Sequence, residues 1–409
     1  MDNRRYYGLD ALRGGMMLLG IVLHGTTFYL SDPPPQMAGM PLDPRRSYLF
    51  DLVFHFIHSF RMPLFFVLAG FFAALLVEKR GMWGTYKDRA ARIVAPLAAS
   101  IVTILPLTLI VVMDVLVAAR FGVIEALPDR AVVQRIGDEM RSAGANVGEP
   151  SILHLWFLLY LCYFYVLMPA CAWLVKSSLR VEGGVKRFLA SPLAIVFFGL
   201  YTAATLWPFR GGQLHEGFLF LKPHVPSMVY YGSFFVFGYC FHHYRDVLKA
   251  FVRWAAAGAV MAVVLFPLSL WLSHHDTQSG APHLAAVIAH GLCTWAIIYA
   301  FTGAILRFFD YESPWILYVS QSAYWVYLVH MFFICTAALL LTAYDLPAIA
   351  KYAIVVSFAT VCCFATYHYL VQRTWVSRFL NGKRFDLDWP WRKARPCSRP
   401  SFPRPSPRS

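Results

Sequence analysis

Long apolar runs separated by short polar segments dominate this chain of 409 residues. A helix needs about 20 predominantly apolar residues to cross roughly 30 Å of hydrocarbon. We find ten runs near that length, with boundaries good to several residues, at about 13–30, 52–77, 93–119, 152–175, 191–208, 227–243, 254–273, 283–306, 317–340 and 351–371. The pattern predicts an all-α fold, a polytopic integral membrane bundle of about ten transmembrane helices.

The segments between the runs are short, apart from one longer loop near 120–151. We expect one transmembrane domain over 1–371 and a tail over 372–409 that is rich in Pro, Arg and Ser, a composition typical of disorder. Basic residues before the first run also fit a signal peptide. The run lacks a small-x-small cleavage site and more runs follow, so we expect an uncleaved first helix.

Composition and charge sharpen the membrane assignment. The chain is 58% hydrophobic and 14% charged, whereas soluble proteins carry about 25% charged residues. The net charge is +14, and 26 of the 36 lysines and arginines fall on the side of the N-terminus when the runs alternate across a membrane. This bias predicts that both termini are cytoplasmic, where anionic lipid head groups also lie. It accounts for the basic tail without a nucleic-acid partner.

Several kinds of site are absent from the sequence. The eight cysteines lie mostly inside the apolar runs, without a Cys-x-x-Cys pair, so we expect neither a disulfide framework nor a thiolate metal site. No His-Glu-x-x-His, P-loop, Gly-x-Ser-x-Gly or dinucleotide fingerprint is present. We therefore predict no metal and no permanently bound cofactor.

Ionisable residues inside the runs are the first functional candidates, because each costs about 2.5–3.5 kcal/mol near the bilayer centre. His24 follows Arg13 by eleven residues, so the two share one helix face about 16 Å apart. Asp10 precedes Arg13 by one turn and is a candidate partner for it. Taken singly, Arg13 is equally explained as a cytoplasmic anchor and His24 as a hydrogen-bonded core histidine.

Two further runs carry polar residues at a similar depth. Arg61 lies too deep in its run for snorkelling to explain it; His58 is one turn nearer the outer face, and Pro63 predicts a kink. His330 has Tyr327 three residues before it on a similar face. His24, Arg61 and His330 thus come from three helices to one expected level, which predicts a shared site.

Polar or aromatic residues also mark the two mouths of the bundle. His154 and Trp156 begin the fourth run at its outer end, where such residues are also ordinary interfacial anchors. Arg89 and Arg92 share a face at the cytoplasmic boundary, and paired guanidinium groups suit phosphate. Positive-inside topology explains this pair equally well.

Five blocks in this order and spacing resemble acyltransferase family 3 over roughly residues 5 to 380. They are Arg13-x10-His24, HSFRMPLFFVLAGFF (58–72), Arg89-x-x-Arg92, HLWFLLYL (154–161) and SAYWVYLVH (322–330). Within the family, the HSFRM and HLWFL blocks are similar to the OpgC/MdoC type, the succinyltransferases of osmoregulated periplasmic glucans. The fourth run lacks the Glu common in the wider family, and Ala69-Gly70-Phe71 replaces Ser-Gly-Phe.

The resemblance implies a multi-pass enzyme of the bacterial inner membrane that moves an acyl group from cytoplasmic acyl-CoA to a glycan hydroxyl outside. His24 would be the general base, because an imidazole with an ordinary pKa of about 6.5 works near neutral pH, or it would carry an acyl-histidine intermediate. Arg61 would bind the oxyanion or the carboxylate of a succinyl donor. Arg13, Arg89 and Arg92 would serve the donor. His330 with Tyr327, and His58 and His154 with Trp156, would line the acceptor path.

Three readings of the function follow. The first is a glucan O-succinyltransferase that uses succinyl-CoA. The second is an O-acetyltransferase of lipopolysaccharide, exopolysaccharide or another envelope glycan that uses acetyl-CoA. The third is a transporter, which usually shows inverted repeats that this sequence lacks. The sequence leaves homo-oligomer formation open.

Overall fold

The computed structural model describes residues 6–34, 37, 42–121, 130–142, 152–178, 182–214 and 223–382. Every regular element within these ranges is a helix, and none of them contains a strand. The all-α prediction is confirmed for this part of the chain.

The helices follow each other with short connections. Their bounds are α1 Tyr7–Thr26, α2 Tyr48–Arg89, η2 Ala90–Val94, α3 Ala95–Val102, α4 Ile104–Phe121, α5 Arg130–Ser142, η3 Leu153–Leu155, α6 Trp156–Val166, α7 Met168–Ser178, α8 Glu182–Ala190, α9 Leu193–Leu206, η5 Arg210–Gly212, α10 Val225–His243, α11 Val247–His274, α12 Gly280–Phe308, α13 Pro314–Leu341, α14 Ala348–Thr366, η6 Tyr367–Val371 and α15 Trp375–Asn381.

Five helical stretches of the described chain are long and apolar enough to cross a membrane: Tyr48–Val102, Val247–His274, Gly280–Phe308, Pro314–Leu341 and Ala348–Val371. Two bent pairs raise the number to seven if each pair is one span. One is η3–α6 with α7, bent by 52°, and the other is α8 with α9, bent by 92°. Each of the ten predicted runs overlaps a helix, but length and composition support five to seven spans.

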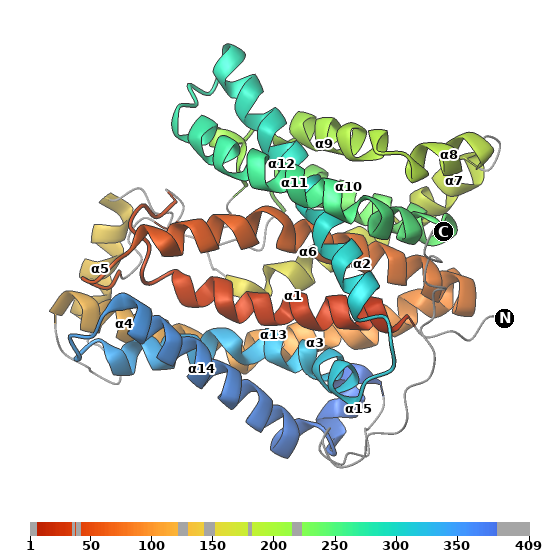
Figure 1. Cartoon of the computed structure of the whole chain (residues 1–409). Coiled ribbons are helices and arrows are strands. Elements are labelled where there is room, and N and C mark those ends of the chain that lie inside the picture. Colours follow the sequence, from red (N-terminus) through yellow and green to blue (C-terminus); the bar gives the residue numbers. More distant parts are fainter. Residues whose placement is uncertain are drawn as a thin grey trace.

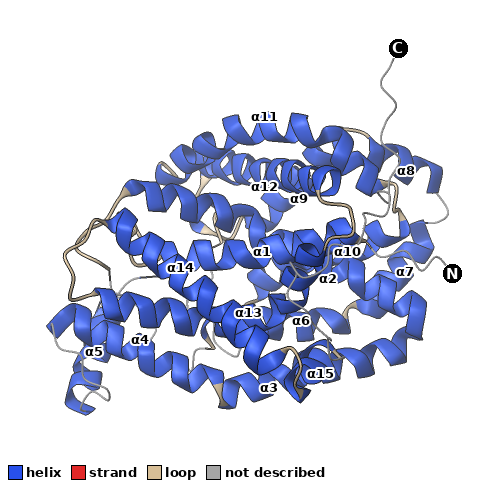
Figure 2. Cartoon of the chain, turned by 60° about the horizontal axis from the view of Figure 1, so that its bottom comes forward, coloured by secondary structure: helices blue, strands red, loops and turns tan. Residues whose placement is uncertain are grey.

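Helix α1 lies in the middle of the bundle. Figure 1 shows it between α9, α11 and α12 on one side and α4, α13 and α14 on the other. It packs mainly on α13 and α2, with further contacts to α14 and α12. Helices α11 and α12 form an antiparallel hairpin whose members stay side by side in the turned view of Figure 2. A polar residue on the buried face of α1 is therefore surrounded by several other helices.

Helix α2 carries the Arg61 block and is broken at a glycine. The non-helical residue within it is Gly81, with φ 71° and ψ 172°, a conformation that only glycine adopts easily. The backbone around Pro63 keeps helical dihedral angles, so the break that redirects α2 lies at Gly81. After it the chain continues through the π-helix η2 into α3, and this turn places Arg89 and Arg92 beside α13.

The two ends of the bundle are defined by different residues. At the inner end, where α1 begins, the Gly8 amide donates to Asp310 Oδ1 at 2.8 Å. At the outer end, where α1 finishes, buried Lys351 forms an ion pair with Asp43 at 2.6 Å. Because both partners are nearly fully buried, the loop before α2 is fixed against the start of α14.

The described fold extends beyond the predicted domain boundary at residue 371. Helix α15 packs against η2, η6 and α13, and Gly382 ends it in the left-handed conformation with φ 74°. A Cβ on Gly382 would lie 2.1 Å from Arg92 Nη2, so the end of this helix borders the inner arginines. The rest of the predicted tail, 383–409, lies outside the described residues.

Two glycines permit the closest helix contact in the bundle core. A Cβ on Gly70 of α2 would lie 1.9 Å from the Phe235 carbonyl oxygen of α10, and a Cβ on Gly238 would lie 1.9 Å from the Val67 carbonyl oxygen. Small residues that let helix backbones approach are the usual device of packing in membranes. This contact holds α10 against the half of α2 that carries Arg61.

We expect Gly70→Ala to destabilise the protein by at least about 2 kcal/mol, because both atoms that would clash belong to helix backbones. Thermal unfolding in detergent measures the change. Gly15→Ala is the matched control: a Cβ there has no neighbour within 4 Å, and alanine favours the helix. Equal melting temperatures for the two variants would contradict the close approach.

Candidate functional site

Three histidines from three elements meet in the bundle interior. His24 lies near the end of α1, His330 lies in α13, and His154 lies in η3. The ring centroids of His24 and His330 are 5.2 Å apart, and those of His154 and His330 are 5.1 Å apart. The convergence of His24 with His330 that the sequence predicted is therefore present, and His154 joins them.

Backbone carbonyls of α13 fix two of these rings. His330 Nδ1 lies 2.8 Å from the Tyr327 oxygen and 3.1 Å from the Val326 oxygen. His154 Nε2 lies 3.0 Å from the Leu328 oxygen. Because a carbonyl only accepts, each of these nitrogens carries a proton and the neutral ring keeps a lone pair on its other nitrogen. Those nitrogens, His330 Nε2 and His154 Nδ1, are buried without a partner.

His24 is the most accessible member of the three. It is half-buried, whereas His330 and His154 are 1% and 6% exposed. Within the described ranges its ring nitrogens have no hydrogen-bond partner, and no carboxylate is bonded to any of the three rings. A neutral imidazole in this position can accept a proton from a hydroxyl placed beside it.

Arg61 supplies the positive charge of the site. Its side chain is 4% exposed, Nε donates to the Met16 carbonyl at 3.1 Å, and the guanidinium lies over the Phe65 ring at 5.6 Å. Among the described residues the bond from Nε is the one hydrogen bond of this group, so both Nη groups remain for a ligand. The charge acts on His24, His154 and His330.

Room for the Arg61 guanidinium comes from a glycine of α1. A Cβ on Gly20 would lie 2.3 Å from Nη2 and 2.9 Å from Cζ. Any larger residue would displace the charged group from its place beside the histidines. Gly20 is thus a positioning residue that sequence reasoning missed, although a glycine one turn before His24 was a visible signal.

The other predicted acceptor residues occupy different surroundings. Tyr327 donates its hydroxyl to the His154 carbonyl oxygen at 2.6 Å and so ties η3 to α13. Trp156 is 8% exposed, with its ring centroid 5.3 Å from that of Tyr231. His58 is half-buried on α2, one turn from Arg61, and its ring stacks on Phe54 at 5.3 Å. Of these three, His58 borders accessible space, while Tyr327 and Trp156 pack inside the protein.

The inner arginines gather around one carboxylate. Asp88 Oδ1 lies 2.7 Å from Arg80 Nη1 and 3.1 Å from Arg92 Nε, and Asp88 Oδ2 lies 3.4 Å from Arg89 Nη2. Three guanidinium groups share one carboxylate, so positive charge is in excess. Arg13 lies apart, with Nη2 bonded to the Ser320 hydroxyl at 2.6 Å and 3.5 Å from Asp10. Its predicted pairing with Asp10 is confirmed.

Asp88 and Arg80 are the members of this cluster that sequence reasoning missed. Asp88 precedes Arg92 by four residues on a helix, a spacing that predicts an ion pair. Arg80 had no such signal, because the break at Gly81 brings it back to Asp88. Across the described ranges, no three His, Cys, Asp or Glu side chains are arranged to hold a metal ion.

Comparisons with known proteins agree with this arrangement. Residues 6–368 match the family model of acyltransferase family 3, described as an acyltransferase domain. The chain is 25% identical over 343 residues to "Glucans biosynthesis protein C" of Escherichia coli O139:H28 (strain E24377A / ETEC), which covers 80% of this chain and 81% of that protein. The protein of the same name from Escherichia coli O81 (strain ED1a) gives the same values. No solved structure matches.

The family model covers nearly the whole chain, and its range includes all five sequence blocks and every residue of the site. The resemblance noted from the sequence is therefore confirmed, and the chain belongs to acyltransferase family 3.

Proposed function

We propose that this protein is a membrane O-acyltransferase that moves a succinyl group from cytoplasmic succinyl-CoA to a hydroxyl of a periplasmic glucan, with His24 as general base. The observation that carries the proposal is the half-buried, unpartnered His24 imidazole beside the buried Arg61 charge. Membership of the family supports acyl transfer. The name of the relatives, which ties them to glucan biosynthesis, supports a glucan acceptor.

The reaction uses these groups in order. A nitrogen of His24 takes the proton from the acceptor hydroxyl while the oxygen attacks the thioester carbonyl carbon. The tetrahedral oxyanion that forms is stabilised by the Nη groups of Arg61. When the carbon–sulfur bond breaks, the imidazolium of His24 gives its proton to the leaving thiolate, so the products are the ester and free CoA thiol.

The donor is bound from the inner end. The excess charge of Arg80, Arg89 and Arg92 suits the phosphates of CoA, because guanidinium groups bind phosphate oxygens in pairs. The pantetheine arm then reaches His24 between α1 and α13. Arg13 stands on this route at about the length of eleven helical residues, roughly 16 Å, from His24.

Two other products distinguish the remaining readings. An O-acetyltransferase of lipopolysaccharide or exopolysaccharide would use the same groups with acetyl-CoA, and the mass of the acceptor identifies it. A transporter would release no CoA thiol when acceptor is added. The second alternative has less support, because family membership favours group transfer.

We expect His24→Ala to lower the transfer rate by about 10²–10⁴-fold, the usual cost of removing a positioned base. Mass spectrometry of periplasmic glucans from cells with and without the protein measures it as loss of the succinyl increment. His243→Ala, which truncates an exposed histidine at the end of α10, is the control and keeps the increment. Succinylated glucan in the His24→Ala strain would end the general-base assignment, and an acetyl increment would identify the second reading.

We expect Arg61→Gln to lower kcat by about 10²-fold, as loss of an oxyanion donor does elsewhere, with little change in KM for the donor. Gly20→Ala leaves Arg61 in the chain but displaces its guanidinium, so kcat falls in the same direction. Gly15→Ala again serves as the control. Steady-state rates of CoA thiol release measure both, and a normal kcat for Arg61→Gln would contradict the oxyanion role.

We expect the double variant Arg89→Ala with Arg92→Ala to raise KM for acyl-CoA at least about tenfold while KM for the acceptor stays unchanged, because charge-assisted bonds to phosphate are lost. The effect shrinks for a donor that lacks the 3′-phosphate. Arg253→Ala, an exposed arginine of α11, is the control. An unchanged donor KM in the double variant would rule out the phosphate role.

A further inference from the structure

A second polar group lies on the outer side of His24 and Arg61, between α2 and α12. Thr294 of α12 donates to the Ser59 carbonyl of α2 at 3.0 Å, and Phe301 meets Phe60 at 5.3 Å, so the two helices run parallel here. One turn outward from Thr294 and Ser59 lie His290 and His55. Two more imidazoles are thus buried in an apolar part of the bundle.

His290 has unused hydrogen-bonding capacity. It is 7% exposed, and its Nδ1 is buried without a partner. It interacts electrostatically with both His55 and His58. A buried ring nitrogen without a partner is unfavourable in an apolar bundle unless a ligand or water satisfies it. His290 therefore indicates that something polar occupies this place.

Space for such a ligand borders the neighbouring histidines. His55 and His58 share one face of α2 and are only half-buried, whereas Phe54 and Ile57 beside them are 1% and 3% exposed. Histidines within membrane helices almost always face the bundle interior or a water-filled cavity. The accessible sides of His55 and His58 then face the same interior space as His24.

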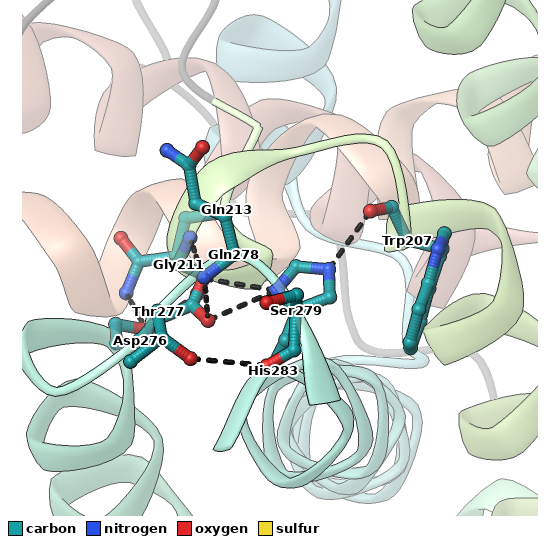
Figure 3. Close-up of polar contacts among 9 residues, drawn as sticks. Trp207, Gly211, Gln213, Asp276, Thr277, Gln278, Ser279 and His283 are labelled. Carbon is teal, nitrogen blue, oxygen red and sulfur yellow. Dashed lines mark hydrogen bonds and ion pairs between the residues drawn. The ribbon is translucent and has the colours of Figure 1, made fainter. Parts of the chain in front are cut away.

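A clasp at the outer end holds the side chain that covers this group. Figure 3 shows Trp207, Gly211 and Asp276 around His283. His283 Nδ1 lies 2.9 Å from Asp276 Oδ2 and Nε2 lies 2.8 Å from the Trp207 oxygen, so both ring nitrogens face acceptors and the ring is an imidazolium. The Gly211 amide donates to the same Asp276 oxygen at 2.6 Å.

The charge on Asp276 keeps the clasp closed. Burial alone would raise the pKa of this carboxyl. The hydrogen bonds from His283 and from the amides of Gln278 and Gly211 hold its pKa below the usual range. The turn that contains Gly211 and Gly212, both at positive φ, is thereby fixed to the loop between α11 and α12.

The clasp positions Gln213 next to the histidines. Gln213 is 8% exposed, and its amide nitrogen donates to the Ser273 hydroxyl at 3.0 Å. The same side chain is hydrogen bonded to His55. An amide held in this way offers one more fixed polar group at the outer side of His55.

We propose that His55, His58, His290 and Gln213 form an acceptor subsite that binds adjacent hydroxyls of a sugar residue on its way to His24. The inference rests on the proposed acyl transfer and names the groups that hold its acceptor. Imidazole and amide groups both donate and accept, which suits hydroxyls. An anionic ligand is disfavoured, because the carboxylates of Asp51 and Asp32 act on His55.

The subsite connects to the outer surface through His274. This residue interacts with His55, and its side chain is 52% exposed. It lines a groove between α2 and α11 together with Tyr48 and Trp271, whose exposed aromatic faces suit the approach of a sugar ring.

The test compares KM values for the two substrates in purified protein. Its probes are succinyl-CoA and periplasmic glucan from cells that lack this protein. We expect His290→Ala to raise KM for glucan at least about tenfold, equal to about 1.4 kcal/mol of binding, with kcat and KM for succinyl-CoA unchanged. Gln213→Leu gives the same split and remains informative if His290→Ala does not fold. His275→Ala, exposed on α11–α12 loop residues outside the clasp, keeps both KM values.

A binding measurement separates this inference from the proposed function. Calorimetry of glucan binding to His24→Ala protein needs no turnover, and we expect the additional change His290→Ala to weaken Kd at least about tenfold. Absence of transfer by the unaltered protein would overturn the proposed function, whereas this binding difference would still support the subsite. Unchanged glucan Kd and KM in both His290→Ala and Gln213→Leu would overturn the subsite.

Discussion

The burial of the Arg61 guanidinium inside an apolar helix bundle is the constraint on which the site depends. A charge at this depth is costly unless other groups surround it. The Met16 carbonyl binds Nε, the Phe65 ring covers one face, and Gly20 leaves space for Nη2. These contacts tie α1 to α2 at one level, and α13 brings His330 to the same level because it packs along α1.

Polar groups continue from this level toward both ends of the bundle, and their chemistry differs. Toward the inner end, three arginines around Asp88 give an excess of positive charge beside α13. Toward the outer end, uncharged rings and an amide predominate around His290. A charged donor and a neutral, hydroxyl-rich acceptor would each meet the end that suits them. The central histidines and Arg61 lie between these two regions.

Much of the site was predictable because its residues carry a local signal. Arg61 and His330 stand out in apolar runs, and five ordered blocks identify the family. Gly20 and His290 lack such a signal: one acts by having no side chain, and the other is one histidine among 14. Their importance comes from contacts with other helices. The same holds for Arg80, which reaches Asp88 only because Gly81 redirects the chain.

The sequence by itself determined the all-helical class, the approximate positions of the apolar helices and the family, since hydrophobic length and motif order are properties of the chain alone. It also showed which residues share a helix face, because helical periodicity is local. Tertiary structure decided which helices meet and which ring nitrogens remain unpaired. A hydrogen bond such as that from His154 to the Leu328 carbonyl joins residues 174 positions apart, and only packing of α13 against η3 creates it.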